Sequence, residues 1–337
     1  MISVVIPLYN KSLTIGNTIS SVLNQSCQDF EVVIVDDGST DNSVEVVNQY
    51  VSDSSKIRLF HQANQGVCAA RNKGVYESKG EFVAFLDADD LWHPRYLELM
   101  NNMIKDKPDA GMYCSAGFYS RYDGKGKLLR IANKYPKPSQ HIDFFENPVV
   151  FSHTSATVVS KEKFLKVGGF VEGMKCCEDM RTFRILALYY PVMYCGWPIS
   201  KYVCGVPSAI TGTDKDEIRT WQFSYVTQYY NDIYDEMMKL GGVRCNHNAY
   251  LWFKFAVRGR ILGALKSRDK ELLHYIIANY KFMEILRPVE KRFYLMDLDR
   301  IAICWVYFTK AIWRLHGYPV FREKLKNREI PKEFLEW

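Results

Sequence analysis

The carboxylates most suited to chemistry in this sequence are those of Asp87-Ala88-Asp89, which follow the apolar segment Phe82–Leu86. Two carboxylates just past the end of a buried strand can bind one divalent cation and leave coordination positions open for phosphate oxygens. Such a cation offsets the negative charge that develops on a departing nucleoside diphosphate. The sequence has neither a glycine-rich P-loop nor a GxGxxG turn, so a bound nucleotide has more need of a metal.

Three other polar segments precede this pair in the sequence and could contribute to the same site. They are Pro7-Leu8-Tyr9-Asn10, Asp36-Asp37-Gly38-Ser39-Thr40-Asp41 and Ala69-Ala70-Arg71-Asn72-Lys73-Gly74. The first two follow β-rich segments, as the aspartates do, and the third lies on a predicted helix. Ligands of open α/β sheets bind outside the carboxyl ends of the strands, so we expect the four groups to converge on one crevice.

Each group also has an ordinary structural interpretation. Asp89 or Asp90 could cap a helix predicted over Leu91–Lys105, Asp37 could form a turn with Gly38, and Arg71 could pair with a surface carboxylate. An isolated pair of this spacing is more often a cap than a metal site. The joint occurrence of all four groups at one sheet edge favours the functional interpretation.

The elements that must position these residues alternate along the first hundred positions. Apolar, β-branched segments predict strands, and residues with helical spacing separate them, which predicts an α/β fold with a mostly parallel sheet. The predicted strands are Ser3–Pro7, Val32–Val35, Arg58–His61 and Phe82–Leu86, with later strands at 112–119 and 155–159. The intervening helices lie around Ile15–Leu23, Val44–Val51 and Ala69–Val75.

Four segments together resemble the family 2 glycosyltransferases of the GT-A fold: SVVIPLYNK, VVIVDDGSTDNS, NQGVCAARNKG and FVAFLDADD. The resemblance extends over residues 1–210 and implies a Rossmann-like sheet, a UDP-sugar donor, Mn²⁺ or Mg²⁺, and inversion at the anomeric carbon. It implies that Asp37 binds the nucleobase, in a pocket shaped by residues 7–10. It also implies that Arg71 and Asn72 lie near the diphosphate and Asp87 near the ribose. The full set that it implies for the nucleotide sugar is Pro7, Tyr9, Asn10, Asp37, Arg71, Asn72, Asp87 and Ala88, with Asp89 and Asp87 for the metal.

Inverting transfer also requires a general base that deprotonates the acceptor hydroxyl. The candidates are Glu178 and Asp179, which follow Gly168-Gly169-Phe170 and precede a helix predicted over Asp179–Leu188. The same resemblance makes the second acidic residue, Asp179, the base. The alternative is that the pair only caps the helix.

The sequence departs from the family pattern after this helix. Many relatives have a Tyr-x-x-His segment there, whereas this chain reads Tyr202-Val203-Cys204-Gly205-Val206-Pro207-Ser208, without histidine. His153 is a possible substitute as third metal ligand, although a lone histidine beside Ser and Thr is more often structural. The loop 205–215 could close over the donor, with Lys215 reaching a phosphate.

Amphipathic helices dominate after residue 215. They are predicted at Trp221–Leu240, Ala249–Leu265, Leu272–Leu286 and Leu298–Leu315. We therefore divide the chain into a catalytic domain at 1–215, with a donor half at 1–110 and an acceptor half at 111–215, and a helical region at 216–337. The polar segment Tyr122–Pro138 is expected to be an exposed excursion.

Positive charge gathers in the helical region. Residues 241–337 hold 19 Lys and Arg against 10 Asp and Glu, whereas the whole chain has a net charge of +6. Basic amphipathic helices with aromatic residues can lie on an anionic membrane, or their apolar faces can pack on the catalytic domain, which the pattern alone favours. No nucleic-acid motif accompanies the charge. No signal peptide, membrane-spanning run or zinc-type cysteine cluster is apparent, and the nine cysteines are expected to be reduced.

These features predict an inverting glycosyltransferase on the cytoplasmic face of the cell membrane, attached peripherally. It would move one hexose or N-acetylhexosamine from a UDP-sugar to a lipid-linked or oligosaccharide acceptor, such as an undecaprenyl-diphosphate-linked sugar of O-antigen or capsule assembly. The alternative is a non-catalytic nucleotide-sugar-binding protein. A processive synthase ranks lower, because the chain lacks transmembrane helices and a Gln-x-x-Arg-Trp motif.

Overall fold

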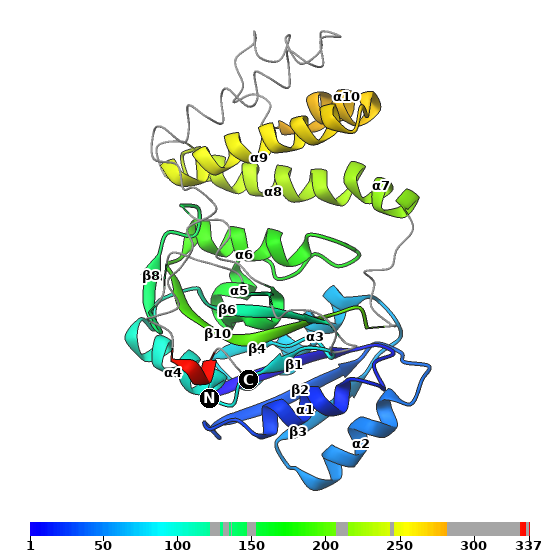
Figure 1. Ribbon diagram of the computed structural model, residues 1–337, viewed down its shortest axis with the longest axis vertical. Helices are drawn as coiled ribbons and strands as arrows, with labels where there is room; N and C mark the ends of the chain where they lie inside the picture. The colour runs from blue at the N-terminus through cyan, green and yellow to red at the C-terminus, as the bar shows by residue number, and fades with distance from the viewer. Residues whose placement is uncertain are drawn as a thin grey trace.

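The computed structural model describes residues 1–121, 129–130, 135, 137–146, 153–206, 215–242, 246–281, 331–334 and 337. A twisted sheet forms the base of the molecule and has helices on both faces, and the later helices α7 to α10 stack beyond α6 (Figure 1). The helical C-terminal region predicted from the sequence is therefore present.

The sheet contains ten strands among the described residues. Its first part has the order β3-β2-β1-β4, with all neighbours parallel. A short strand, β9, lies antiparallel between β4 and β6, so β6 and its parallel neighbour β10 run in the same direction as β1 to β4. The prediction of a mostly parallel sheet is thus confirmed. The strand bounds are β1 Ile2–Leu8, β2 Phe30–Asp36, β3 Ile57–His61, β4 Phe82–Phe85, β5 Leu91–Trp92, β6 Met112–Arg121, β7 Leu129–Arg130, β8 Gln140–Ile142, β9 Thr157–Ser160 and β10 Val192–Cys204.

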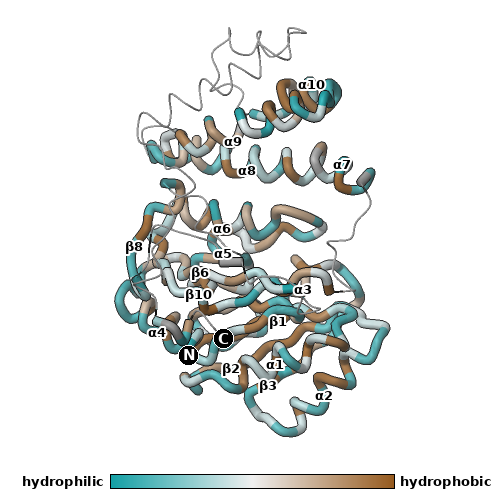
Figure 2. The backbone as a smooth tube through the Cα atoms, in the orientation of Figure 1, coloured by the Kyte–Doolittle hydropathy of each residue, from teal (hydrophilic) through white to brown (hydrophobic). Residues whose placement is uncertain are grey.

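Alternation along the central strands builds a hydrophobic core on each face of the sheet. In β1, Val4 and Ile6 pack on one face with α1 (Ile15–Leu23), α2 (Ser43–Asp53) and α4 (Tyr96–Asp106). Val5 points to the other face, towards α3 (Val67–Glu77), α5 (Lys161–Lys166) and α6 (Glu178–Tyr189). Figure 2 shows hydrophobic residues along these inner strands, which fixes the register of the sheet relative to its helices.

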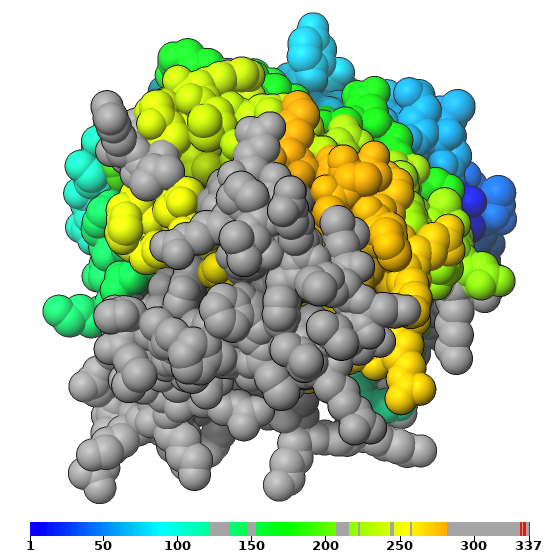
Figure 3. All heavy atoms as spheres, turned by 90° about the horizontal axis from the view of Figure 1, so that it is seen from above, coloured from blue at the N-terminus to red at the C-terminus, as the bar shows by residue number. Residues whose placement is uncertain are grey.

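The C-terminal helices continue the second core. They are α7 (Lys215–Phe223), α8 (Tyr225–Lys239), α9 (His247–Lys266) and α10 (Lys270–Asn279). Ile233 of α8 and Trp252 and Phe253 of α9 are buried in the same cluster as Phe183 of α6. Seen from above, the side chains of α8, α9 and α10 form part of one face of the molecule (Figure 3). Among the described residues, none of the helices has the length and apolar character that a membrane crossing requires.

A final segment of the chain packs against β10 and the start of α4. The short helix η6 (Lys332–Phe334) lies beside α4 in Figure 1. Phe334 is fully buried, with its ring 4.6 Å from the rings of His93 and Trp197. The indole of Trp337 donates a hydrogen bond to the Pro198 carbonyl at 2.9 Å. Residues 331–334 and 337 are therefore packed against the edge of the sheet formed by β5 and β10.

Several predicted elements differ from the structure. The helix expected over Leu91–Lys105 is wrong at its start, because residues 91–92 pair with β10 as β5 and α4 begins at Tyr96 with Arg95 at its N-cap. The helix expected at Trp221–Leu240 is divided at Ser224 into α7 and α8. Strands β8 and β10 and helix α5 were not predicted. The helix expected at Leu298–Leu315, most of 122–138 and the loop 207–214 lie outside the described residues.

Candidate active site

The polar groups singled out in the sequence lie at the carboxyl ends of three neighbouring strands. Tyr9 and Asn10 follow β1, Asp37 follows β2, and Asp87 lies just past β4. Because β1 lies between β2 and β4, these side chains share one sheet edge. The convergence expected from the sequence is present.

The segment after β1 is fixed against the loop after β2. Asn10 adopts a positive φ of 51°, and its side-chain oxygen accepts hydrogen bonds from the amides of Thr40 at 2.8 Å and Asp41 at 3.3 Å. Pro7 is half-buried within β1, whereas Tyr9 is 45% exposed. The ring of Tyr9 is therefore accessible at this edge of the sheet for contact with a ligand.

Asp37 is buried, and its carboxylate accepts hydrogen bonds from the segment that precedes α3. Its Oδ1 accepts hydrogen bonds from the amide of Gln65 at 2.9 Å and from Nε2 of Gln62 at 2.8 Å, while Oδ2 accepts one from the amide of Gly66 at 2.8 Å. A carboxylate has about four lone-pair sites, so one acceptor position on Oδ2 is left for a ligand.

The two carboxylates of the Asp87-Ala88-Asp89 segment each contact a cation from another element. Asp87 Oδ1 lies 2.7 Å from Nη2 of Arg71, and Asp89 Oδ2 lies 2.6 Å from Nζ of Lys11. Burial and the charge of Asp87 raise the pKa of Asp89, and Lys11 offsets part of that rise. Ala88 is buried between them. Negative charge is thus concentrated where water cannot fully solvate it.

Asp90, the next residue, is fully buried and has a role that the sequence did not reveal. It accepts hydrogen bonds from Oγ of Ser155 at 2.5 Å and from the amide of Val203 in β10 at 2.9 Å. Burial, followed by the charges of Asp87 and Asp89, raises its pKa well above the usual range. The expectation that Asp89 or Asp90 caps the following helix is therefore wrong, and Asp90 instead connects this segment to β10.

Arg71 connects Asp87 to the acidic pair of α6. The guanidinium is 4% exposed, with Nη2 on Asp87 and Nη1 3.0 Å from Oε1 of Glu178. Its neighbour Asn72 holds the Gly-Gly-Phe segment, because its side-chain nitrogen donates to the Phe170 carbonyl at 2.8 Å and its oxygen accepts from the Phe170 amide at 3.1 Å. Arg71 and Asn72 therefore fasten α6 and the Gly-Gly-Phe segment to α3.

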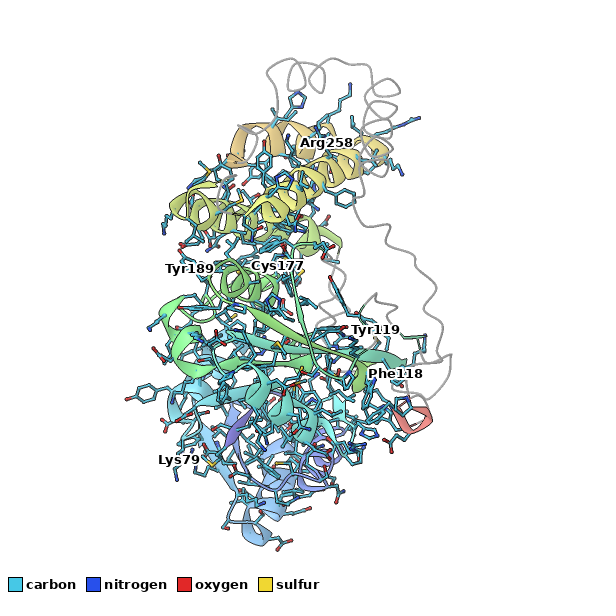
Figure 4. All side chains as sticks on the ribbon, turned by 90° about the vertical axis from the view of Figure 1, so that its left-hand side faces the viewer. Lys79, Phe118, Tyr119, Cys177, Tyr189 and Arg258 are labelled. Atoms are coloured by element: carbon cyan, nitrogen blue, oxygen red, sulfur yellow. The ribbon has the colours of Figure 1, made fainter. Side chains whose placement is uncertain are left out.

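The Glu178-Asp179 pair forms the first turn of α6. Cys177, at a φ of 64°, is the N-cap residue and its side chain makes no capping hydrogen bond, so neither acidic residue occupies the N-cap position. Figure 4 labels Cys177 at this end of α6, below α9, which carries the labelled Arg258. Burial and the charge of Asp179 raise the pKa of Glu178, and Arg71 partly offsets this effect. Asp179 Oδ2 accepts a hydrogen bond from Oγ1 of Thr154 at 2.8 Å.

The donor set suits a hard divalent cation only in part. Among the residues that the structure describes, no three His, Cys, Asp or Glu side chains come together as a metal site. Asp87 and Asp89 nevertheless offer hard oxygen ligands in a partly buried, anionic setting, and a bound cation would offset their negative charge. Mg²⁺ is commonly held by one or two carboxylates together with substrate phosphates and water, so the two side chains fit a metal that arrives with its nucleotide.

His153 lies beside these carboxylates and is close to Asp90. Its Nε2 is 3.9 Å from Asp90 Oδ2 and has no hydrogen-bond partner among the residues that the structure describes, and burial lowers the pKa of the imidazole to about 4. The ring also contacts Tyr202 at 5.5 Å. Its use as a third metal ligand stays a prediction. The side chain of Lys215 lies outside the described residues.

Known proteins share both the sequence pattern and the architecture. The family described as Glycosyl transferase family 2 matches residues 3–167. The chain is 34% identical over 143 residues to the putative glycosyltransferase EpsH of Bacillus subtilis (strain 168), covering 42% of this chain and 41% of EpsH. It is 36% identical over 124 residues to the glycosyltransferase GlyG of Streptococcus pneumoniae serotype 4, covering 36% of this chain and 40% of GlyG. These alignments span about two fifths of those relatives.

The likeness to solved structures extends further along the chain. The crystal structure of S. aureus TarS 1–349 in complex with UDP superposes with a TM-score of 0.66 at 18% identity, covering 97% of this chain and 94% of TarS 1–349. The complex with UDP-GlcNAc gives 0.68 at 17% identity, with 94% and 92% covered. At such low identity, the structural likeness establishes the fold alone, which is that of the GT-A glycosyltransferases. The family match covers residues 3–167, so this part of the chain belongs to glycosyl transferase family 2.

Proposed function

We propose that this chain transfers one hexose or N-acetylhexosamine from a UDP-sugar to a hydroxyl group of a glycan acceptor, with inversion at the anomeric carbon. The observation that carries the proposal is the bridge made by Arg71. One buried guanidinium contacts Asp87 on the donor side and Glu178 on the acceptor side, at 2.7 and 3.0 Å. The two acidic motifs therefore lie close together, on either side of Arg71.

On the donor side, the free acceptor position of Asp37 would receive an N–H of the nucleobase, and the exposed ring of Tyr9 would contact its face. Asp87 would bind the ribose. Lys11, already beside Asp89, supplies positive charge close to where a diphosphate would lie. UDP is the preferred nucleotide because the TarS structures of the same fold contain UDP and UDP-GlcNAc.

Asp89, with Asp87, would hold a Mn²⁺ or Mg²⁺ ion. When bound, the ion would stabilise negative charge on the leaving diphosphate. The chain's own contribution is to orient both carboxylates through hydrogen bonds from Lys11 and Arg71. Their burial makes this electrostatic arrangement stronger than it would be in water.

On the acceptor side, Asp179 would act as general base. The acceptor oxygen would form the new bond to the anomeric carbon while the bond from that carbon to the diphosphate oxygen breaks, and the hydroxyl proton would pass to the Asp179 carboxylate. Glu178 faces Arg71 instead, and so would serve to position the guanidinium. Attack opposite the leaving group inverts the configuration.

We further propose a lipid-linked acceptor, such as an undecaprenyl-diphosphate-linked sugar of O-antigen or capsule assembly. The support is the excess of basic residues in 241–337, which would attract an anionic headgroup or diphosphate. Residues 1–215 would then form the catalytic unit, and 216–337 would contact acceptor or the anionic inner face of the cell membrane. Since α8 and α9 bury their apolar sides against α6, any such contact would use their outer surfaces.

A panel of UDP-sugars tests this proposal, with a synthetic lipid-diphosphate N-acetylhexosamine as acceptor and Mn²⁺ present. One donor should yield a product whose new linkage has the opposite anomeric configuration, seen by proton NMR. EDTA should abolish turnover, and Asp179→Asn should do so while leaving UDP binding intact. UDP-sugar binding without transfer or hydrolysis in every combination would instead favour a non-catalytic nucleotide-sugar-binding protein.

A further inference from the structure

The turn at residues 153–156 lies between the two acidic motifs and contacts both. It contains the short helix η1 (Thr154–Ala156), which directly precedes β9. Ser155 is fully buried; its Oγ donates to Asp90 and accepts from the amide of Asp87 at 3.0 Å. The adjacent Thr154 donates from Oγ1 to Asp179 at 2.8 Å. Consecutive hydroxyls therefore link the donor-side segment to the start of α6.

The contacts of Asp179 define the orientation of its carboxylate. Oδ1 accepts a hydrogen bond from the amide of Met180 at 2.6 Å, and Oδ2 accepts the one from Thr154. Thr154 is 4% exposed, so its hydroxyl has little access to competing water. With one donor on each oxygen, rotation of the carboxylate is restricted, and each oxygen keeps acceptor capacity for a further hydrogen bond.

We propose that Thr154 is a positioning residue for the transfer reaction: its hydroxyl holds Asp179 in the orientation that receives the proton of the acceptor hydroxyl. The inference rests on the proposed role of Asp179 as base. Proton transfer requires the base within hydrogen-bond reach and correctly aimed, and small misplacements of reacting groups lower the rate steeply. Thr154 itself takes no proton, and it acts through Asp179.

The test is a pair of substitutions at one position. Thr154→Val keeps the shape of the side chain and removes the donor, whereas Thr154→Ser keeps the hydroxyl and removes a methyl group. Thr157→Val is the matched control, because Thr157 is also buried, in β9, and the one hydrogen bond of its hydroxyl among the described residues is with Cys114 Sγ, at 3.8 Å. For each full-length variant, kcat with the best donor and acceptor and the calorimetric Kd for UDP with Mn²⁺ are measured beside Asp179→Asn.

Thr154→Val should lower kcat about tenfold or more, leave the Kd for UDP within about twofold, and be rescued by Thr154→Ser to within about threefold of wild type. Thr157→Val should match the wild type. The positioning role is overturned if Thr154→Val keeps full kcat, if Thr154→Ser loses as much as Thr154→Val, or if the UDP Kd weakens in proportion to kcat. An active Asp179→Asn overturns the base and the positioning role together, whereas an inactive Asp179→Asn beside a fully active Thr154→Val overturns the positioning role alone.

Discussion

Replacing Arg71 with methionine removes a buried cation that compensates two carboxylates. Removing one partner of a buried ion pair costs about 3–5 kcal/mol, because the remaining charge is left without compensation. Glu178 is 14% exposed on its side chain and Asp87 is 26% exposed, so most of the cost falls on Glu178. We therefore expect Arg71→Met to lose about 4 kcal/mol of unfolding free energy at neutral pH.

This loss should depend on pH in a defined direction. Burial and Asp179 already raise the pKa of Glu178, and Arg71 opposes that rise. Without Arg71 the folded-state pKa rises further above the unfolded value, so the folded variant binds a proton that the unfolded chain releases. Stability is then retained below the unfolded pKa and lost as pH rises through the folded pKa. The variant should be closer to wild type at about pH 5 than at about pH 7.5.

Denaturant unfolding at both pH values measures the effect, with Arg95→Met as the control. Arg95 is 37% exposed and pairs with Glu98 and Glu333, so its removal should cost about 1 kcal/mol, as expected for surface pairs. If Arg71→Met costs no more than this control, or costs the same at both pH values, Arg71 does not compensate a buried Glu178 charge.

Three further predictions concern the framework. Gly74→Ala would place a Cβ 2.3 Å from Cγ1 of Val5. Calorimetry should therefore show about 1–3 kcal/mol of lost stability, which Val5→Ala partly restores. An unchanged melting temperature would contradict the close approach of α3 to β1. Burial alone would raise the pKa of Glu31, but hydrogen bonds from its neighbours, Arg58 among them, lower it. Glu31→Gln should therefore cost about 1.5–3 kcal/mol at neutral pH, with the difference shrinking as pH falls below the unfolded pKa, and a pH-independent difference would refute the ionic contribution. Phe334→Ala should cost about 3–5 kcal/mol in denaturant unfolding, and a loss below 1 kcal/mol would mean that η6 is not docked on the sheet.

The sequence was sufficient to place the donor-side residues at one sheet edge. Strand ends and turn residues are local signals, and parallel strands bring their carboxyl ends together whatever their exact length. Asp37, Asp87 and Asp89 could therefore be located without coordinates. Their contacts could not be located in this way, because the partners Lys11 and Arg71 belong to other parts of the fold.

The missed features are those that depend on distant contacts or irregular backbone. Strand β10 contains Gly196 and Pro198 and shifts register twice against β6, so neither alternation nor composition marks it as a strand. The role of Asp90 depends on Ser155 and Val203, residues far along the chain. A carboxylate before an apolar segment resembles a helix cap, and only the tertiary structure shows it buried beneath the sheet edge.

The central claim is that the crevice beside Asp89 binds the diphosphate of a UDP-sugar through a divalent ion. Calorimetric titration of UDP into the wild-type chain and into Asp89→Asn, each with and without Mn²⁺, tests it most directly. We predict one UDP per wild-type chain, bound at least about tenfold more tightly with Mn²⁺, and no such gain in Asp89→Asn. Equal UDP affinity in both proteins under both conditions would contradict the account.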